Sequence, residues 1–299
     1  MIKAEGRLPE GLIVKGVGGL YYAQGVDGAQ HVLRAKGKFR RQHISPMVGD
    51  RIRYSAGSGE EHGWVEEILP RKNVLTRPPV ANVNTLIVVI APQPAPDLLL
   101  MDTLLVIARE QKIPTAIVVN KCDLHSDLGG EIRRAYARLG APVLEVSAKT
   151  GQGLDALKDV MSMGICCFAG QSGVGKSTLL CSVTGLTLQT GEISRRIARG
   201  KHTTRHAELM TSGVYSVLDT PGFSLLELWG NLEPIRLKTF YPEFEEYEGQ
   251  CRFSPCYHLS EPGCAVLDAA ERGDVPPERV ARYHVLLQKT QKAWRERYE

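Results

Sequence analysis

The sequence lacks any long hydrophobic segment, since no apolar run approaches the roughly 20 residues that a membrane-spanning helix needs. Its first six residues, Met1-Ile2-Lys3-Ala4-Glu5-Gly6, lack the apolar core of a secretory signal peptide. Hydrophobic residues make up 43% and charged residues 23% of the 299 positions, which is ordinary for a globular protein. We therefore expect a cytoplasmic protein with two or three domains and no membrane partner.

Cysteine is scarce, and its count of seven is odd, which argues against a fully paired disulfide framework. Cys166 and Cys167 lie in an apolar run and Cys181 lies in a helical pattern, so we interpret them as small buried hydrophobic residues. Cys122 occupies the variable position of a motif described below. The remaining three cysteines stand close together in the sequence and call for a different explanation.

Net charge is also small, at +4, but it is unevenly distributed. The first 77 residues hold 13 Lys and Arg against 8 Asp and Glu, so this quarter carries +5 and the rest about −1. Short strand patterns separated by glycine fill this region and predict a small β-barrel. Arg34, Lys36, Lys38 and Arg40 recur at period two, which predicts a strand face that binds a nucleic acid. An edge strand protected by cations would show the same pattern.

From Thr85 onward the pattern changes to alternating strands and helices, which predicts a parallel, doubly wound α/β sheet. The apolar runs 85–90, 115–119, 142–146, 164–169 and 214–218 are the expected strands. The expected helices are 98–111, with Asp97 as its N-cap, 128–139 and 154–161. A third, smaller unit follows from about Ser224 and ends in a helix from Glu278 to about Trp294.

A phosphate-binding loop follows the strand predicted at 164–169. Its sequence fits G-x-x-x-x-G-K-[ST] and opens a helix, the context in which such a loop cradles phosphates with its backbone N–H groups. Lys176 would reach the β- and γ-phosphates of a nucleotide, and Ser177 would bind Mg²⁺. The predicted nucleotide-binding residues of this loop are Gly170, Gln171, Ser172, Gly173, Val174, Gly175, Lys176, Ser177 and Thr178.

The element that distinguishes guanine from adenine lies about fifty residues upstream of this loop. Asn120-Lys121-x-Asp123 ends one predicted strand, and Ser147-Ala148-Lys149 ends the next. The carboxylate of Asp123 can accept hydrogen bonds from guanine N1–H and its 2-amino group, a pattern that adenine lacks. The sequence therefore predicts GTP and GDP as ligands.

Two further elements lie downstream. Asp219-Thr220-Pro221-Gly222 is a D-x-x-G element, in which Asp219 would hold the Mg²⁺ shell and Gly222 would sense the γ-phosphate. The basic segment 199–206 precedes it, and its Thr204 is the expected second protein ligand of Mg²⁺. A basic loop that only contacts RNA remains an alternative for this segment.

Phe223 stands where Ras-like GTPases carry the glutamine that orients water. An apolar side chain cannot orient water, so we expect intrinsic hydrolysis to be slow or to depend on another group. His202 is the nearest candidate for that group, and a histidine that only contacts phosphate or RNA is an equal alternative.

The last cluster is Cys251-x4-Cys256-x-His258-x5-Cys264. Three thiolates and one imidazole suit a tetrahedral Zn²⁺ ion and leave no open position for catalysis. We therefore predict one structural zinc, with free or oxidised thiols as the alternative.

The motif order, with N-K-x-D and S-A-K before the phosphate loop and D-x-x-G after it, resembles that of circularly permuted GTPases. Together with the preceding barrel and the Cys-x4-Cys-x-His-x5-Cys cluster, it resembles the small ribosomal subunit biogenesis GTPases (RsgA, also called YjeQ or YloQ) over essentially the whole chain. The resemblance implies an OB-fold that binds 16S ribosomal RNA and a slow GTPase stimulated by the 30S subunit. It also implies action late in the maturation of that subunit, with release of another assembly factor.

We accordingly expect three domains in a monomer. An OB-fold would span 1–75, a circularly permuted GTPase domain 76–225 and a mostly helical zinc-binding domain 226–299. Two other functions stay open from the sequence alone: an RNA-binding scaffold that uses GTP only as a ligand, and a GTPase that serves tRNA or membrane targets. A further hypothesis is that the segment after Gly222 couples the nucleotide state to the zinc-binding domain.

Overall fold

The structure is a computed structural model that describes residues 8–57, 61–76, 79–185, 208–213, 215–219 and 232–297. Residue contacts divide the chain into two compact units, each assembled from segments that are distant in the sequence. Unit 1 comprises Met1–Thr85, Asp159–Phe168 and Thr184–Phe223. Unit 2 comprises Leu86–Lys158, Ala169–Val183 and Ser224–Glu299. The domain limits expected after residues 75 and 225 stay predictions.

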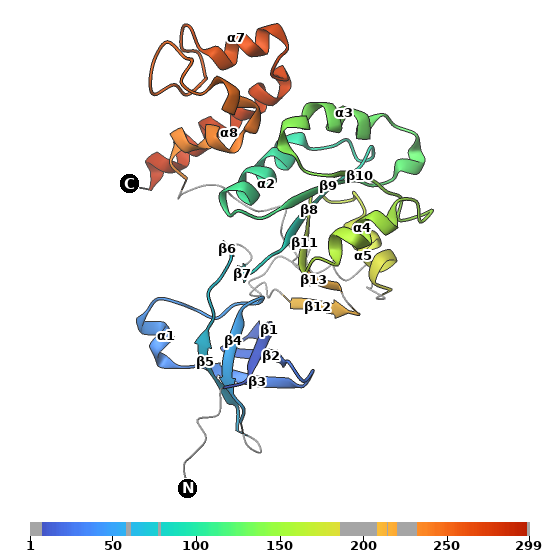
Figure 1. Cartoon of the computed structure of the whole chain (residues 1–299), viewed down its shortest axis with the longest axis vertical. Coiled ribbons are helices and arrows are strands. Elements are labelled where there is room, and N and C mark those ends of the chain that lie inside the picture. Colours follow the sequence, from blue (N-terminus) through green and yellow to red (C-terminus); the bar gives the residue numbers. More distant parts are fainter. Residues whose placement is uncertain are drawn as a thin grey trace. The chain divides into compact units, whose positions relative to one another are not determined.

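The N-terminal part of unit 1 is a five-stranded barrel (Figure 1). Its strands follow the order β1-β2-β3-β5-β4, and β4 pairs with β1 to close the barrel. The pair β3–β5 is parallel and the other pairs are antiparallel. A closed five-stranded barrel of this kind is an OB-fold, as predicted. The strands are β1 (Glu10–Val17), β2 (Leu20–Gly25), β3 (Gln30–Ala35), β4 (Arg51–Ser55) and β5 (Gly63–Ile68).

Each barrel strand contributes one fully buried side chain to a common core. These five residues are Ile13, Ala23, Leu33, Ile52 and Val65, all 0% exposed. Burying one large aliphatic side chain stabilises a fold by about 1.5–3 kcal/mol. A buried side chain from every strand therefore explains why short segments of modest hydrophobicity form this barrel.

The prediction of four cations on one strand face is wrong. Strand β3 ends at Ala35, and the short helix α1 (Gly37–Arg41) follows at once. Phe39 is the buried residue of this helix, so the turn directs its aromatic ring inward and leaves Lys38 and Arg40 outside. The basic residues recur at every second position because a helical turn follows the end of a strand. Over only seven residues, this pattern cannot be distinguished from that of a longer strand.

The described remainder of unit 1 includes strands from later in the chain. Strand β11 (Ile165–Ala169) pairs in parallel with β13 (Tyr215–Asp219), and β12 (Glu208–Ser212) pairs antiparallel with β13. The strands predicted at 164–169 and 214–218 are thus confirmed to within one residue. Cys166 and Cys167 are fully buried, as predicted. A two-stranded ribbon, β6 (Val74–Thr76) and β7 (Pro79–Ala81), completes the unit.

Unit 2 is built on the parallel strands β8 (Thr85–Ile90), β9 (Thr115–Val119) and β10 (Val143–Glu145). The apolar run of β8 is buried at every position, as expected of a strand covered on both faces. The helices are α2 (Leu98–Glu110), α3 (Leu128–Ala135), α4 (Leu154–Met161) and α5 (Lys176–Thr184). Asp97 caps α2 as predicted, since its carboxylate accepts a hydrogen bond from Leu100 N at 2.8 Å. Helix α3 ends four residues earlier than predicted, and the single turn η2 (Ala137–Leu139) follows Tyr136.

The C-terminal part of unit 2 is helical (Figure 1). It contains the 3₁₀ helices η4 (Pro234–Phe240) and η5 (Pro242–Tyr247), then α7 (Ala265–Arg272) and α8 (Pro277–Glu296). Three aromatic rings form its core: Tyr241 and Phe244 stack, and Tyr283 of α8 meets both edge-on, with all three pairs of ring centroids 5.1 Å apart. Among the described helices, none combines the length and apolar character needed to cross a bilayer.

A buried ionic network joins α8 to α2. Asp102 of α2 is 0% exposed and accepts hydrogen bonds from Arg279, from Arg282 at 2.6 Å and from the Tyr136 hydroxyl at 2.5 Å. Arg279 is 3% exposed and also donates to Glu243 at 2.5 Å. Its guanidinium lies 4.4 Å from the ring centroid of Tyr136 and 4.6 Å from that of Tyr241. Each charged side chain of this network is therefore partnered, which is the condition for tolerating charges in a core.

Candidate nucleotide-binding site and metal centre

The phosphate loop links the end of β11 to the start of α5, and its glycines fit where a side chain would not. A Cβ on Gly170 would lie 2.1 Å from the carbonyl oxygen of Val89, and the residue has a φ of 138°. A Cβ on Gly175, which has a φ of 93°, would lie 2.4 Å from the amide nitrogen of Asn120. The loop thus packs directly on the ends of β8 and β9, where ligands bind in parallel α/β sheets.

Lys176 begins α5 and folds back over the loop. Its Nζ donates hydrogen bonds to the carbonyl oxygens of Gly170 and Gln171, both at 2.7 Å. Burial lowers the pKa of this ammonium, because the charged form loses water there. A partly desolvated cation at the mouth of an N–H-lined loop is suited to bind polyphosphate. Ser177 and Thr178 follow in the first turn of α5.

Asn120 connects the guanine-reading segment to the phosphate loop. The side chain is 2% exposed, its Nδ2 donates to the carbonyl oxygen of Val174 at 2.8 Å, and its Oδ1 accepts from Ala148 N at 3.2 Å. Lys121 adds a second link, because its Nζ donates to the carbonyl oxygens of Gln93 at 2.6 Å and Gly173 at 2.9 Å. The two predicted motifs therefore meet in space, although they lie about fifty residues apart.

Asp123 lies on the single-turn helix η1 (Cys122–Leu124), which follows Lys121. Its Oδ1 accepts a hydrogen bond from the Ser147 hydroxyl at 2.7 Å, and this bond is the main reason that the carboxyl pKa lies below its usual value. Lys149 lowers the same pKa through its charge. A half-buried carboxylate that stays ionised and is oriented by a hydroxyl is suited to accept two hydrogen bonds from guanine.

Gln171 has a contact that its place in the motif did not suggest. Its Oε1 accepts from Asp97 N at 2.5 Å and its Nε2 donates to the carbonyl oxygen of Ala95 at 2.9 Å. The phosphate loop is therefore tied to the N-terminus of α2, the same helix that carries the buried Asp102. No local sequence signal marks this contact, because its partners lie 74 and 76 residues earlier.

The predicted γ-phosphate and Mg²⁺ elements fall largely outside the described residues. The residues outside the description are His202, Thr204, Gly222, Phe223 and the segment that follows Phe223. Asp219 is the last residue of β13, where its backbone pairs with Glu208, and its side chain lies outside the description.

The cysteine cluster forms one compact group. The ligand atoms of Cys251, Cys256, His258 and Cys264 lie within 4.8 Å of one another. Cys251 Sγ lies 3.9 Å from Cys264 Sγ and 3.6 Å from His258 Nδ1. Two sulfurs bound to one tetrahedral zinc at about 2.3 Å lie roughly 3.8 Å apart, so these residues fit the ion. Burial lowers the pKa of His258, which favours the neutral imidazole that binds metals.

Glu261 holds the loop that carries these ligands. Its carboxylate accepts hydrogen bonds from the backbone N–H groups of Tyr257 at 2.7 Å, Leu259 at 2.8 Å and Ser260 at 3.1 Å. Burial alone would raise the pKa of this carboxyl, but the backbone hydrogen bonds outweigh it and lower the pKa to about 2. The loop between Cys256 and Cys264 is thus folded around a carboxylate that the sequence pattern did not single out.

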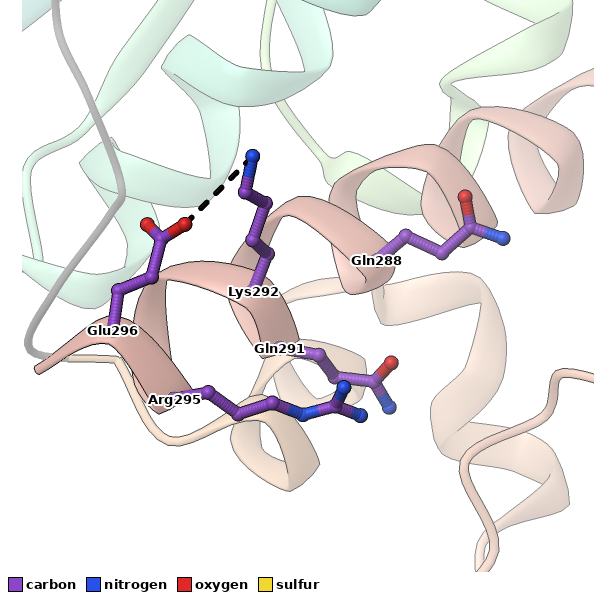
Figure 2. A pocket seen from close by; sticks show the side chains of 5 residues that line it. All are labelled: Gln288, Gln291, Lys292, Arg295 and Glu296. Atoms are coloured by element: carbon purple, nitrogen blue, oxygen red, sulfur yellow. Dashed lines mark ion pairs between the residues drawn. The ribbon is translucent and has the colours of Figure 1, made fainter. Parts of the chain in front are cut away.

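A hollow of about 430 Å³ along the C-terminal half of α8 lies apart from both sites (Figure 2). Gln288, Gln291, Lys292, Arg295 and Glu296 line it, and all five come from one face of this helix. Lys292 Nζ lies 3.7 Å from Glu296 Oε1. These side chains are polar and mostly exposed, so the hollow is a surface feature and contains none of the predicted site residues.

Comparisons with known proteins agree with this geometry. The RsgA N-terminal domain model matches residues 10–65, and the RsgA GTPase model matches residues 68–229. The small ribosomal subunit biogenesis GTPase RsgA of Ruminiclostridium cellulolyticum is 42% identical over 280 residues, covering 91% of each chain. The protein of the same name from Geobacillus thermodenitrificans is 42% identical over 285 residues, covering 92% of this chain and 95% of its own.

Solved structures show the same relationship. YjeQ from Thermotoga maritima superposes with a TM-score of 0.80 at 34% identity, covering 95% of this chain and 99% of its own. YloQ, described as a circularly permuted GTPase, superposes with a TM-score of 0.76 at 30% identity and covers 98% of both chains. Since the guanine-reading segment also precedes the phosphate loop here, the chain belongs to the RsgA family of circularly permuted GTPases.

Proposed function

We propose that this protein is a slow GTPase that assists late maturation of the 30S ribosomal subunit, binds 16S rRNA and is stimulated by the 30S subunit. Release of another assembly factor would accompany hydrolysis. The observation that carries the proposal is the contact of Asn120 with Val174 and Ala148, which brings the guanine-reading segment, its companion and the phosphate loop to one place. Relatives at about 42% identity are named small ribosomal subunit biogenesis GTPases.

In this proposal the nucleotide is held at both ends. Asp123 accepts hydrogen bonds from guanine, and Ser147 keeps its carboxylate ionised and oriented. The backbone N–H groups of Gly173 to Lys176 surround the phosphates, and Lys176 exchanges its bonds to loop carbonyls for bonds to phosphate oxygens. Mg²⁺, when bound, neutralises developing phosphate charge and would be held by Ser177 and Thr204, with Asp219 in its shell.

Slow intrinsic hydrolysis follows from the residue after Gly222. Phe223 has no group that can orient a water molecule, so the attacking water must be placed by another side chain or by the ribosomal partner. His202 is the proposed side chain. We also expect Gly222 to sense the γ-phosphate and to pass its presence to the segment that follows.

The remaining parts of the chain receive structural and binding roles. The OB-fold, expected within 1–75, would contact 16S rRNA, and one zinc ion bound by the cluster of three cysteines and one histidine would fix the loop 251–264 within the domain expected at 226–299. The GTPase domain would span 76–225. We expect the protein to act as a cytoplasmic monomer.

Hydrolysis of GTP with and without purified small subunits tests the proposal. We expect the 30S subunit to raise multiple-turnover hydrolysis well above the intrinsic rate, and we expect 50S subunits and tRNA to have little effect. The Lys176→Ala variant should lose both rates and serves as the control for contaminating GTPases. Equal stimulation by tRNA, or no stimulation by 30S subunits, would contradict the proposed partner.

A further inference from the structure

A groove of about 650 Å³ runs along the barrel in unit 1, within the size range of pockets that hold small ligands, about 300–1,000 Å³. One wall is formed by the end of β3 and by α1, and the other by residues 43–46. Its lining includes four basic side chains and two partly exposed aromatic ones: Arg34, Lys36, Arg40, His43, Tyr21 and Trp64. Among the described residues that line it, none is an aspartate or a glutamate.

Trp64 presents an aromatic surface to solvent at this groove. It is 43% exposed, whereas its neighbours Gly63 and Val65 are buried, so its indole points away from the barrel core. Strand β5 pairs in parallel with β3, and Trp64 is the Cα partner of Arg34. The two side chains therefore stand side by side on the outer face of the sheet. An exposed indole beside a guanidinium is the arrangement on which nucleobases stack.

Among the described residues, only part of the positive charge at the groove is neutralised by an ion pair. Lys36 is bound to Glu66, with Nζ 2.5 Å from the carboxylate. Arg34 and Arg40, by contrast, form no ion pair with any described residue. Uncompensated guanidinium groups beside an aromatic ring favour an anionic ligand that also has a flat apolar face.

The far wall of the groove is held in place before any ligand arrives. The buried carboxylate of Asp50 accepts two hydrogen bonds from Arg71, at 2.7 and 2.8 Å, and a third from Met47 N at 2.8 Å. The same guanidinium donates to the carbonyl oxygen of Ser45 at 2.7 Å. The backbone N–H of Ile44 also donates to the carbonyl oxygen of Phe39, at 3.0 Å. A rigid wall lowers the entropy cost of binding.

We propose that this groove binds an unpaired stretch of RNA, with one base stacked on Trp64 and the adjoining phosphates bound by Arg34 and Arg40. The inference rests on the proposed RNA partner and states which form of RNA the barrel recognises. In a double helix the bases are stacked on each other and their faces are inaccessible, so Trp64 could not engage them. An acidic protein segment would satisfy the cations but would leave the indole without a stacking partner.

Binding of fluorescein-labelled 12-nucleotide single-stranded RNA to the full-length protein, followed by anisotropy, tests the inference. We expect Trp64→Leu to weaken binding by about 5- to 150-fold, the range for loss of one stacked base. Trp64→Phe retains an aromatic ring. Its decrease in the logarithm of RNA affinity should be less than about a third of the decrease caused by Trp64→Leu. Thermal unfolding is expected to stay unchanged in both variants, because the indole is partly exposed already.

Three further arms of the experiment separate the ligand classes and the residue roles. The double variant Arg34→Gln, Arg40→Gln should reduce the slope of log affinity against log salt by about 1.4, which corresponds to two single-strand phosphate contacts. A 12-base-pair duplex RNA should bind Trp64→Leu as well as it binds the wild type. Poly-glutamate should not displace the single strand at equal charge concentration, and displacement would instead assign the groove to an acidic protein segment.

If the Trp64→Leu variant binds single-stranded RNA as tightly as the wild type does, the inference is overturned. If 30S subunits still stimulate hydrolysis by the wild type in that case, the proposed function survives and only the inference about the groove fails. If 30S subunits do not stimulate the wild type at all, the proposed function itself fails. A Trp64→Leu variant that loses single-stranded RNA and also loses part of the 30S stimulation would support both.

Discussion

Asp102 and Arg279 form an ion pair in the interior of unit 2, although 177 positions separate them in the chain. Asp102 is 0% exposed and Arg279 is 3% exposed. The pair fixes α8, and with it the region that carries the cysteine cluster, to helix α2. Helix α2 is in turn bound to the phosphate loop through Asp97 and Gln171. The C-terminal helices are therefore linked to the nucleotide-binding region by a buried ion pair and by an exposed hydrogen bond.

Asp102→Ala should strongly destabilise the protein. Removing one partner of a buried pair leaves an uncompensated charge, here shared by Arg279 and Arg282, and costs about 3–5 kcal/mol in the free energy of unfolding. Urea denaturation measures this difference. The exposed pair of Arg138 and Glu246, with N–O 2.9 Å, offers a matched control, since Arg138→Ala should cost less than about 1 kcal/mol. Equal effects of the two substitutions would contradict the role assigned to Asp102.

Asp123→Asn should change base specificity. The carboxylate would accept two hydrogen bonds from guanine, each worth about 1.5–3 kcal/mol when the acceptor is charged, so we expect GDP affinity to fall by at least about 100-fold. Xanthine carries an oxygen where guanine carries the 2-amino group, and an asparagine amide can donate to it. Xanthosine diphosphate should therefore bind the variant better than GDP does.

Asp127 provides the control for this substitution. Its carboxylate lies in the same connection, is 72% exposed and pairs only with Arg134 among the described residues. Asp127→Asn should leave both affinities unchanged, as measured by fluorescence competition with labelled nucleotides. Unaltered base preference in Asp123→Asn would remove Asp123 from the base-reading role.

Nucleotide binding at alkaline pH should be accompanied by proton uptake. Burial lowers the pKa of Lys176 below its usual 10.5 in the unliganded fold. At a pH below this lowered pKa the lysine is charged and buried, so it lowers the free energy of unfolding. This cost is relieved as pH rises. Bound phosphates favour the ammonium and raise its pKa again, so GDP binding at alkaline pH, below the usual lysine pKa of 10.5, should take up a proton.

Calorimetry of GDP binding in two buffers of different ionisation enthalpy measures this uptake. We expect the uptake to decline as the pH falls, because a larger fraction of the lysine is then protonated before the nucleotide binds. Lys176→Met should abolish the alkaline uptake, and Lys292→Met, which changes a side chain that is 78% exposed on α8, should retain it. Uptake of the same size in Lys176→Met would show that another group takes the proton.

Zinc removal should loosen the ligand loop more than it loosens α8. The wild type should contain about one zinc per chain, and Cys256→Ser should contain much less, whereas Cys181→Ser should retain the metal because Cys181 lies on α5, outside the cluster. After chelation, hydrogen exchange should rise most in residues 251–264. The buried face of α8 should stay protected by Asp102. Uniform loss of protection would show that the metal also holds α8.

His202→Ala should lower the rate of 30S-stimulated hydrolysis by about 100-fold or more if the imidazole positions water or transfers a proton. Nucleotide affinity should stay close to that of the wild type, since His202 would act on the water and not on the guanine or the β-phosphate. Rapid-quench measurement of single turnover on the 30S subunit separates hydrolysis from product release. An unchanged rate would assign His202 to contact with RNA or phosphate.

Local patterns were sufficient for the parts of this protein in which neighbours in sequence decide the structure. The apolar runs predicted strands β8, β9 and β11, and Asp97 predicted the start of α2. The phosphate loop was recognisable because it follows a predicted strand and opens a helix. The Asn120 segment was recognisable as the element expected to read guanine because it too follows a predicted strand. The cysteine cluster was recognisable because its four ligands lie within 14 residues of one another.

The basic face of the barrel shows where a local pattern failed. Arg34, Lys36, Lys38 and Arg40 alternate in the sequence, yet the chain turns into a helix at Gly37. Phe39 is the buried residue of that turn, and its burial depends on tertiary packing that the pattern of residues 34–40 does not specify. The groove beside Trp64 exists only because of this turn, so neither its shape nor its lining could be predicted from residues 34–40.

The amino-acid sequence alone determined which chemical groups this protein has and in what order: a phosphate loop, an aspartate before it that is expected to read guanine, and three cysteines and a histidine after it that suit zinc. These depend on short-range geometry, in which a few consecutive residues supply the whole arrangement. Only the tertiary structure decided how those groups are held. The contacts of Asn120 with Val174, Gln171 with Asp97 and Asp102 with Arg279 join residues 54 to 177 positions apart. Such pairings depend on how distant segments pack, and no local pattern encodes them.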